Sequence, residues 1–502
     1  MHRKFGLLGF FIIISLPFFL FLGRDSIQIW DEARNTLNLY EMYQSKNYLV
    51  MTYHGTPDMW NTKPPLLHWI QSIFIEIFGF NEFAIRLPSA IAGFLTCVII
   101  WYFFKKNYTN KYLPYIASFV LASSRGFIDI HSARTGDYDS LLVLFSTISA
   151  LSIYSYIDTL RSKYLYYFFI SLSLGVLTKS IAILLILPGI GLFILLSRNV
   201  LTILKSKHFY LGSLIFVVIV SSFYLLREKY NPGYIDAVLE NEILGRYNKG
   251  LEGNERPFNF YYENFKTRFK WWLYFIPIGL LFGFLNKNAR FTRLTLFSAS
   301  IFITHFLIIS SAKTKLPWYE LPEYPFLSII VSIGLLGILK LLHNETIFEF
   351  GKITQFKKQA ITIFFLIICI IPFGMMMKKI VTDEQEEYYR NNQILPRYFK
   401  EVLEGKRELE DNICVCVSML NQHYHTEYYL IKLKEKNYNI NFCDWKNIPE
   451  NQIIIMGHDD WLKTIIEEYY EHEILEHHQS DWNYWGIKKY LIKKKIKEFE
   501  NI

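Results

Sequence analysis

Two adjacent acids and a cation form the first group of residues in this chain that could do chemistry. Asp31 and Glu32 lie in the segment Trp-Asp-Glu-Ala-Arg, in which Arg34 follows Asp31 by three positions. This spacing places an acid and the guanidinium on one side of a helical turn. Such a carboxylate can take a proton from an incoming hydroxyl or amine, and the guanidinium can bind a phosphate. The alternative is that the two acids mark the start of a helix, where the helix dipole favours carboxylates.

Further acids and cations stand in short polar segments between long apolar runs. His54 and Lys63 follow in the same segment. Asp137 and Asp139 precede an apolar run, and Lys179 separates two others. Cations neutralise a phosphate or pyrophosphate while a carboxylate accepts a proton, so this set suits a lipid-phosphate substrate. Capping of the following helix is the alternative for the two aspartates, and a solvated position in a tight turn is the alternative for Lys179.

The composition is that of a membrane protein. Hydrophobic residues make up 52% of the 502 residues and aromatic residues 18%, with a mean hydropathy of +0.17. These values are too apolar for a typical soluble protein. The formal net charge of +8 does not indicate nucleic-acid binding, because Lys and Arg are dispersed in short clusters between apolar runs. We therefore expect a polytopic membrane protein with membrane lipids, and no nucleic acid, as partners.

Eleven apolar runs are interpreted as membrane spans. They are residues 5–22, 84–104, 112–124, 141–157, 164–177, 181–196, 209–226, 271–285, 294–311, 321–342 and 360–377. One more apolar run, 66–79, is short and is interrupted by Glu76. We expect this run to form a helix that lies along the membrane interface.

Basic residues set the expected orientation in the cytoplasmic membrane. Arg3 and Lys4 precede the first run, and no small-x-small cleavage pattern follows it, so we expect an uncleaved anchor with its N-terminus in the cytoplasm. Eleven spans then place the basic clusters at Lys105, Arg161 and Arg198 on the cytoplasmic side, as the positive-inside rule requires. The candidate acids and cations fall on the outer side.

A change of composition after the last apolar run divides the chain into two expected domains. Residues 1–379 form a transmembrane domain with outer loops at 24–83 and 227–270, and residues 380–502 form a charged tail. In the tail, strand-like phrases alternate with helical patterns, which is typical of a small α/β domain, here expected outside the cytoplasm. The strand-like phrases are 413–417, 438–442 and 453–456, and the helical patterns are 427–436 and 461–470. Either Cys414 or Cys416 could pair with Cys443.

Six short motifs occur in an order that resembles the C-type membrane glycosyltransferases. They are WDEAR at 30–34, TKPPL at 62–66, DYDSLLVLF at 137–145, GVLTKS at 175–180, NEILGRY at 241–247 and KLPWYELPEYP at 315–325. The resemblance covers residues 1–380 and is strongest to the aminoarabinose transferase branch, which is related to the protein O-mannosyltransferases. It implies a mainly α fold, a bundle of about 11–13 transmembrane helices.

The resemblance also implies an activity. Enzymes of this family move a hexosyl or pentosyl group from a polyprenyl-phosphate donor, with inversion, at the outer face of the membrane. The acceptor is a lipid such as lipid A, a glycan or a protein. Because cations can stabilise the departing phosphate, the resemblance implies no required cofactor. A divalent metal ion is an alternative that it leaves open.

The family motifs assign a role to each candidate residue. Asp31 corresponds to the base or acceptor-orienting acid, and Asp139 corresponds to the second essential carboxylate, with Asp137 as its rival. The donor phosphate would be held by Arg34, Lys63, Lys179, Tyr319 and Arg246. Residues left for the acceptor or a metal are Glu32, Asp137, Glu242 and His54. The chain departs from the aminoarabinose branch at Thr62 and Glu242, where that branch often has a glutamate and a histidine.

Two other classes of protein are weighed against the transferase. A transporter or flippase of a lipid-linked substrate would place its ionisable residues in discontinuous spans near the midplane and would show repeated halves. Here the polar residues lie at the ends of the spans. A structural subunit that scaffolds an envelope complex would explain the tail, but not the acids and cations of the outer loops.

Overall fold

The chain folds into two compact units, and each is described by itself. The computed structural model describes residues 2–248, 250, 253–342, 355–382, 387–410, 412–418, 423–457, 459–477, 487–497 and 499. The first unit combines Met1–Leu22 with Glu41–Thr382, and the second combines Gly23–Tyr40 with Asp383–Ile502. Residues 23–40, which the sequence division assigns to the transmembrane domain, thus pack with the C-terminal residues.

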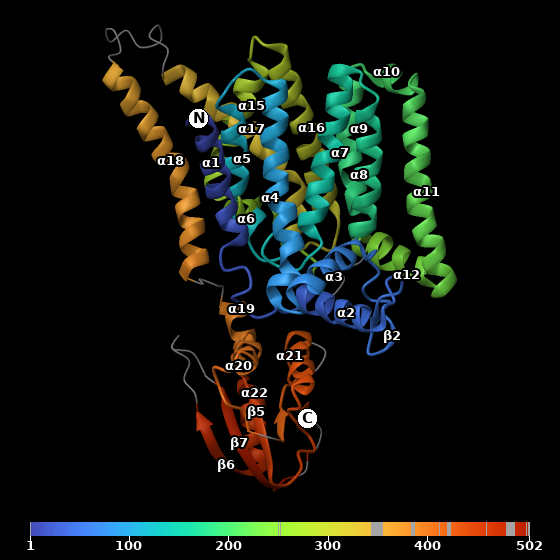
Figure 1. Ribbon diagram of the computed structural model, residues 1–502, viewed down its shortest axis with the longest axis vertical. Helices are drawn as coiled ribbons and strands as arrows, with labels where there is room; N and C mark the ends of the chain where they lie inside the picture. The colour runs from blue at the N-terminus through green and yellow to red at the C-terminus, as the bar shows by residue number, and fades with distance from the viewer. Residues whose placement is uncertain are drawn as a thin grey trace. The chain divides into compact units, whose positions relative to one another are not determined.

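Each apolar run expected to span the membrane folds as a helix of the first unit. These helices are α1 (His2–Phe19), α4 (Glu82–Asn107), α5 (Leu113–Ala122), α7 (Asp139–Thr159), α8 (Lys163–Lys179), η1 (Ser180–Ile186) with α9 (Leu187–Leu196), α11 (Lys207–Tyr230), η4 (Lys270–Tyr274) with α15 (Phe275–Phe284), α16 (Ala289–Ser311), α17 (Tyr324–Leu342) and α18 (Gln355–Thr382). Figure 1 shows them as a bundle. Among the described residues, seven candidate spans are long and apolar enough to cross a membrane. The expected runs outside these spans are the shorter apolar helices Gly6–Phe19, Leu113–Ala122 and Lys270–Phe284.

One candidate span, Lys163–Leu196, contains two of the expected runs. The helix breaks at Ser180, whose φ and ψ are 50° and −134°. A Cβ added to Gly175 would lie 1.9 Å from Ile183 Cδ1. Residues eight apart in one continuous helix would be separated by about 12 Å along its axis. The chain therefore turns back at this point, and Lys179 lies at the tip of a helical hairpin.

The short apolar run forms α3 (Leu66–Phe78), an amphipathic helix. Gln71 and Ile75 are buried one turn apart, whereas Ile73 and Ile77 on the opposite face are exposed. This spacing is that of a helix lying on a surface. In Figure 1, α3 lies at the end of the bundle where α7 begins and α8 ends.

The segments expected as outer loops contain short helices and a β-hairpin. They are α2 (Asp31–Ser45), β1 (Thr52–Tyr53), β2 (Thr56–Pro57), α6 (Arg125–Ile128), α12 (Tyr234–Val238), η2 (Leu239–Leu244), α13 (Gly245–Asn248), α14 (Phe260–Arg268) and η5 (Pro317–Glu323). A short α10 (Val200–Leu204) precedes α11. Most of these elements are polar, and they are stabilised by packing rather than by an apolar run that the sequence reveals.

The C-terminal residues form the small α/β domain that the sequence predicts. Its five-stranded sheet has the order β4-β3-β5-β7-β6, and β3 is parallel to β4 and β5 while β7 is antiparallel to β5 and β6. The strands are β3 (Ile413–Val415), β4 (Ile440–Phe442), β5 (Gln452–Met456), β6 (Tyr470–His477) and β7 (Lys488–Lys495), and the helices are α19 (Glu387–Asn392), α20 (Ile394–Leu403), α21 (Tyr424–Glu435) and α22 (Asp460–Tyr469). The sequence did not predict β6 and β7, because they are rich in charged residues. A disulfide joins Cys414 to Cys443, and Cys416 is a buried free thiol.

Residues 23–40 are held by side chains of this C-terminal domain. Ile27 N donates to Tyr429 Oη at 3.0 Å, and Gln393 Nε2 donates to Ile27 O at 3.0 Å. Lys400 Nζ donates to Gly23 O at 2.6 Å. The domain therefore fixes the backbone that leads into α2.

Candidate functional site

The acids of the Trp-Asp-Glu-Ala-Arg segment do start a helix, because α2 begins at Asp31. Glu32 is buried, and its Oε2 accepts a hydrogen bond from Gln28 N at 2.7 Å, which shapes the turn before the helix. Arg34 is also buried, with its guanidinium carbon 5.0 Å from the centre of the Tyr424 ring. Asp31 is partly exposed. Of these three side chains, Asp31 is the one that a substrate could reach most easily.

Asp139 and Lys179 form a buried ion pair in the first unit. Lys179 Nζ lies 2.7 Å from both carboxylate oxygens of Asp139. Asp139 is the first residue of α7 and Lys179 is the last residue of α8, so the pair closes the ends of two packed helices. The centre of the Tyr319 ring is 5.4 Å from Nζ. The structure thus brings together three of the residues that the motifs assign to the site.

Lys63 forms a second pair with Glu242. Its Nζ lies 3.8 Å from Glu242 Oε1, and Thr62 Oγ1 donates to the same oxygen at 3.3 Å. Nζ also lies 5.7 Å from the centre of the Tyr138 ring, next to Asp139 in the chain. The two positions at which the chain departs from the aminoarabinose branch, Thr62 and Glu242, are therefore in direct contact.

Asp137 has a histidine neighbour that sequence reasoning missed. Asp137 Oδ2 accepts from Thr135 Oγ1 at 2.6 Å and lies 3.5 Å from His131 Nδ1. The His131 ring stacks on Trp318, with ring centres 3.6 Å apart. The available signal was a histidine six positions before Asp137 in the same polar segment. A carboxylate and an imidazole are ligands that divalent transition metals accept, so these two residues could help to hold an ion.

Other candidate residues lie apart or outside the described side chains. His54 is exposed, its ring stacks on Tyr53, and its backbone N–H donates to Glu41 Oε1 at 2.5 Å. The side chain of Arg246 lies outside the described residues. Lys315, at the start of the last motif, is buried and donates from Nζ to Arg256 O at 2.8 Å, and this burial lowers its pKa.

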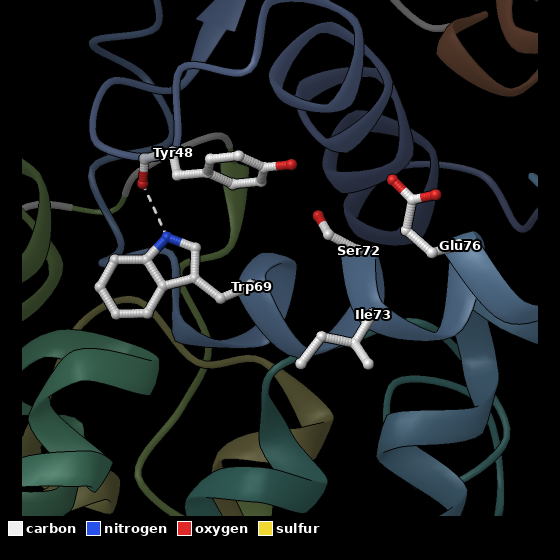
Figure 2. A pocket seen from close by; sticks show the side chains of 5 residues that line it. All are labelled: Tyr48, Trp69, Ser72, Ile73 and Glu76. Atoms are coloured by element: carbon white, nitrogen blue, oxygen red, sulfur yellow. Dashed lines mark hydrogen bonds between the residues drawn. The ribbon is translucent and has the colours of Figure 1, made fainter.

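A cavity of about 440 Å³ opens beside α3. Figure 2 shows its lining, in which the Trp69 indole N–H donates to Tyr48 O at 2.6 Å. The lining residues are Tyr48, Trp69, Ser72, Ile73 and Glu76, none of which is a sequence-predicted site residue.

The predicted site residues are divided between the two units. Asp31, Glu32 and Arg34 belong to the second, and the remaining candidates belong to the first. That the residues of the two units bind one substrate stays a prediction, which rests on the order of the motifs.

Comparisons with known proteins agree with the motifs. Residues 62–225 match the family described as dolichyl-phosphate-mannose-protein mannosyltransferase. An uncharacterised protein of Aquifex aeolicus is 27% identical over 64% of this chain and 63% of its own length. The undecaprenyl phosphate-alpha-4-amino-4-deoxy-L-arabinose arabinosyl transferase 2 of Proteus mirabilis is 26% identical over 63% of this chain and 56% of its own length. The match thus spans less than two thirds of either relative.

A solved structure extends the likeness to nearly the whole chain. ArnT from Cupriavidus metallidurans, bound to undecaprenyl phosphate, superposes with a TM-score of 0.69 at 16% identity, covering 97% of this chain and 98% of that one. The similarity establishes the fold, which is that of a multi-pass membrane protein. In its fold this chain is therefore similar to ArnT, and in the sequence of residues 62–225 it is similar to the family described as dolichyl-phosphate-mannose-protein mannosyltransferase.

Proposed function

We propose that the protein transfers a sugar from a polyprenyl-phosphate donor to an acceptor outside the cytoplasm, with inversion. The observation that carries the proposal is the buried Asp139–Lys179 pair beside Tyr319, at the end of a C-type bundle. A cation held in a water-poor site can stabilise the phosphate as it leaves. The related fold of ArnT bound to undecaprenyl phosphate supports a donor of this class.

The proposed reaction is a single displacement. The acceptor oxygen or nitrogen attacks the anomeric carbon of the donor sugar, and the bond from that carbon to the phosphate oxygen breaks. Asp31 takes the proton of the acceptor, while Lys179, Lys63 and Arg34 balance the charge of the released polyprenyl phosphate. Attack from the face opposite to the leaving group inverts the configuration at this carbon.

The sugar is proposed to be a hexose or a pentose, and the acceptor a lipid, a glycan or a protein. The family model is described by mannose transfer to protein, and the Proteus mirabilis relative by transfer of an aminoarabinose. We place the N-terminus in the cytoplasm and the C-terminal domain outside it. The disulfide between Cys414 and Cys443 supports this side, since disulfides persist in oxidising compartments.

Replacement of Asp31 by Asn tests the function. We expect Asp31→Asn to lose turnover of a polyprenyl-phosphate sugar, measured as released polyprenyl phosphate, while the purified protein keeps its melting temperature. Asp460→Asn is the matched control, because Asp460 is also the first residue of a helix in the same unit. Wild-type turnover by Asp31→Asn would overturn the assignment. Movement of the intact donor across a vesicle bilayer, without its cleavage, would favour the transporter instead.

A further inference from the structure

The short helix η5 carries two fully buried acids on one face. Glu320 and Glu323 are both 0% exposed. A 3-10 helix has three residues per turn, so positions three apart eclipse each other. Trp318 and Tyr319 precede these acids and occupy other faces of the same helix.

Each acid has a basic partner on a different helix. Glu320 Oε1 accepts from Tyr324 Oη at 2.7 Å and lies 3.7 Å from Arg268 Nε, at the end of α14. Glu323 Oε1 lies 2.8 Å from His305 Nδ1, in the C-terminal third of α16. The Oε2 atoms of both acids lack a hydrogen-bond partner among the described residues.

Burial of these groups is unfavourable by itself. Desolvation of an ion in a protein costs several kcal/mol, and a pair recovers this only with good geometry. Apolar residues at the same positions would pack η5 against its neighbours without this cost of desolvation. The hydrogen bonds of Glu323 with His305 and of Glu320 with Tyr324 are directional, however, so they hold the turn in one rotation, which apolar packing does less well.

The remaining faces of η5 contact the basic partners of Asp137 and Asp139. The Trp318 ring stacks on His131, which faces Asp137. Tyr319 lies over Lys179, the partner of Asp139. A small rotation of η5 would therefore move two aromatic rings away from the residues that they cover.

We propose that the His305–Glu323 and Arg268–Glu320 pairs are positioning residues that hold η5 against the donor-phosphate end of the site. This role rests on the proposed transferase function. Misplacement of binding groups by about 1 Å can reduce a rate by about a hundredfold, so loss of either pair affects donor use strongly.

Glu323→Ala and Glu323→Gln, with exposed Glu263→Gln on α14 as the control, test the proposal. Two quantities are measured in the full chain: the KM and kcat for a polyprenyl-phosphate sugar, and the Kd for undecaprenyl phosphate from thermal shifts. We expect Glu323→Ala to raise the donor KM and the Kd by about tenfold or more. Glu323→Gln keeps an acceptor for His305, so its KM and Kd should lie close to the wild-type values. Glu263→Gln should have the KM and Kd of wild type.

The outcomes separate positioning from folding and from the function itself. If Glu323→Ala lowers the melting temperature but leaves the KM and Kd at wild-type values, the pair is only structural and the proposal is wrong. Where Glu323→Ala does not fold, Glu320→Leu, which leaves no acceptor for Tyr324 or Arg268 and fills the site with an apolar side chain, gives the same readout for the second pair, and an unchanged Kd there overturns the proposal. If wild type binds undecaprenyl phosphate without transferring sugar, the proposed function fails, while the Kd still tests the role of η5.

Discussion

Lys179 Nζ donates to both carboxylate oxygens of Asp139 at 2.7 Å, across 40 positions of sequence. Each residue is assigned its own role by the family motifs, one as a carboxylate of the reaction and one as a phosphate-binding cation. Their pairing means that the charge of Lys179 is balanced before a substrate binds. A donor phosphate would therefore share Lys179 with Asp139 rather than meet a bare cation.

The pair predicts a coupled effect on stability. Lys179→Ala and Asp139→Ala should each destabilise the protein by about 3–5 kcal/mol, because each leaves one buried charge without its partner. The double variant Asp139→Leu/Lys179→Met should recover most of this loss, since no charge remains buried. Denaturation of the purified protein in detergent measures these values. Additive losses in the double variant would show that the two side chains do not interact.

Glu242 is expected to weaken the hold of Lys63 on a phosphate. Glu242→Gln removes the negative charge 3.8 Å from Lys63 Nζ. The Kd for undecaprenyl phosphate should therefore fall severalfold, which corresponds to a gain of about 1 kcal/mol in the free energy of binding. Lys63→Ala should raise it. Thermal shift titrations measure both, with the exposed Glu240→Gln on the same helix as the control. An equal change in the Kd from Glu240→Gln would mean that the net charge of this segment, and not the contact of Glu242 with Lys63, sets the affinity for the phosphate.

His425 makes the C-terminal domain sensitive to acid. It is buried, its Nε2 donates to Asn392 O at 2.9 Å, and burial, with the neighbouring His423, lowers its pKa to about 3. Because the folded pKa lies below the unfolded value near 6.5, the unfolded state binds a proton first as the pH falls. The stabilisation is complete above pH 6.5 and is lost on acidification, by about 2 kcal/mol at pH 5.

Hydrogen exchange of residues 424–435 in the full chain, between pH 7 and 5, measures this loss. His425→Gln should flatten the pH dependence, whereas replacement of the partly exposed His472 by Gln should leave it unchanged. A pH profile that is the same in His425→Gln and wild type would remove His425 as the cause.

The disulfide offers a test of the proposed orientation. In intact cells, a membrane-impermeant maleimide should label the partly exposed Cys414 only after treatment with an impermeant reductant. Cys416 should stay unlabelled in the folded protein because its side chain is buried, which makes it an internal control. Labelling that requires permeabilised cells would place the C-terminal domain in the cytoplasm.

The sequence by itself determined the class of the protein, the helices of the apolar runs and the order of the motifs. Apolar runs report on helices because burial in lipid needs long, continuous apolar segments. The motifs at 30–34 and 315–325 and those between them are likewise local strings, so their order could be read without any three-dimensional information. The strands β3, β4 and β5 could be found for the same reason, whereas the charged strands β6 and β7 carry no such signal.

Only the tertiary structure decided which residues meet. The Asp139–Lys179 pair, the contact of Thr62 with Glu242 and the stack of His131 on Trp318 join segments far apart in the chain. Tertiary structure also decided that Cys414, and not Cys416, pairs with Cys443. It likewise decided that residues 23–40 pack with the C-terminal domain. Such contacts depend on how helices and strands pack, and the spacing of residues along the chain carries no record of that packing.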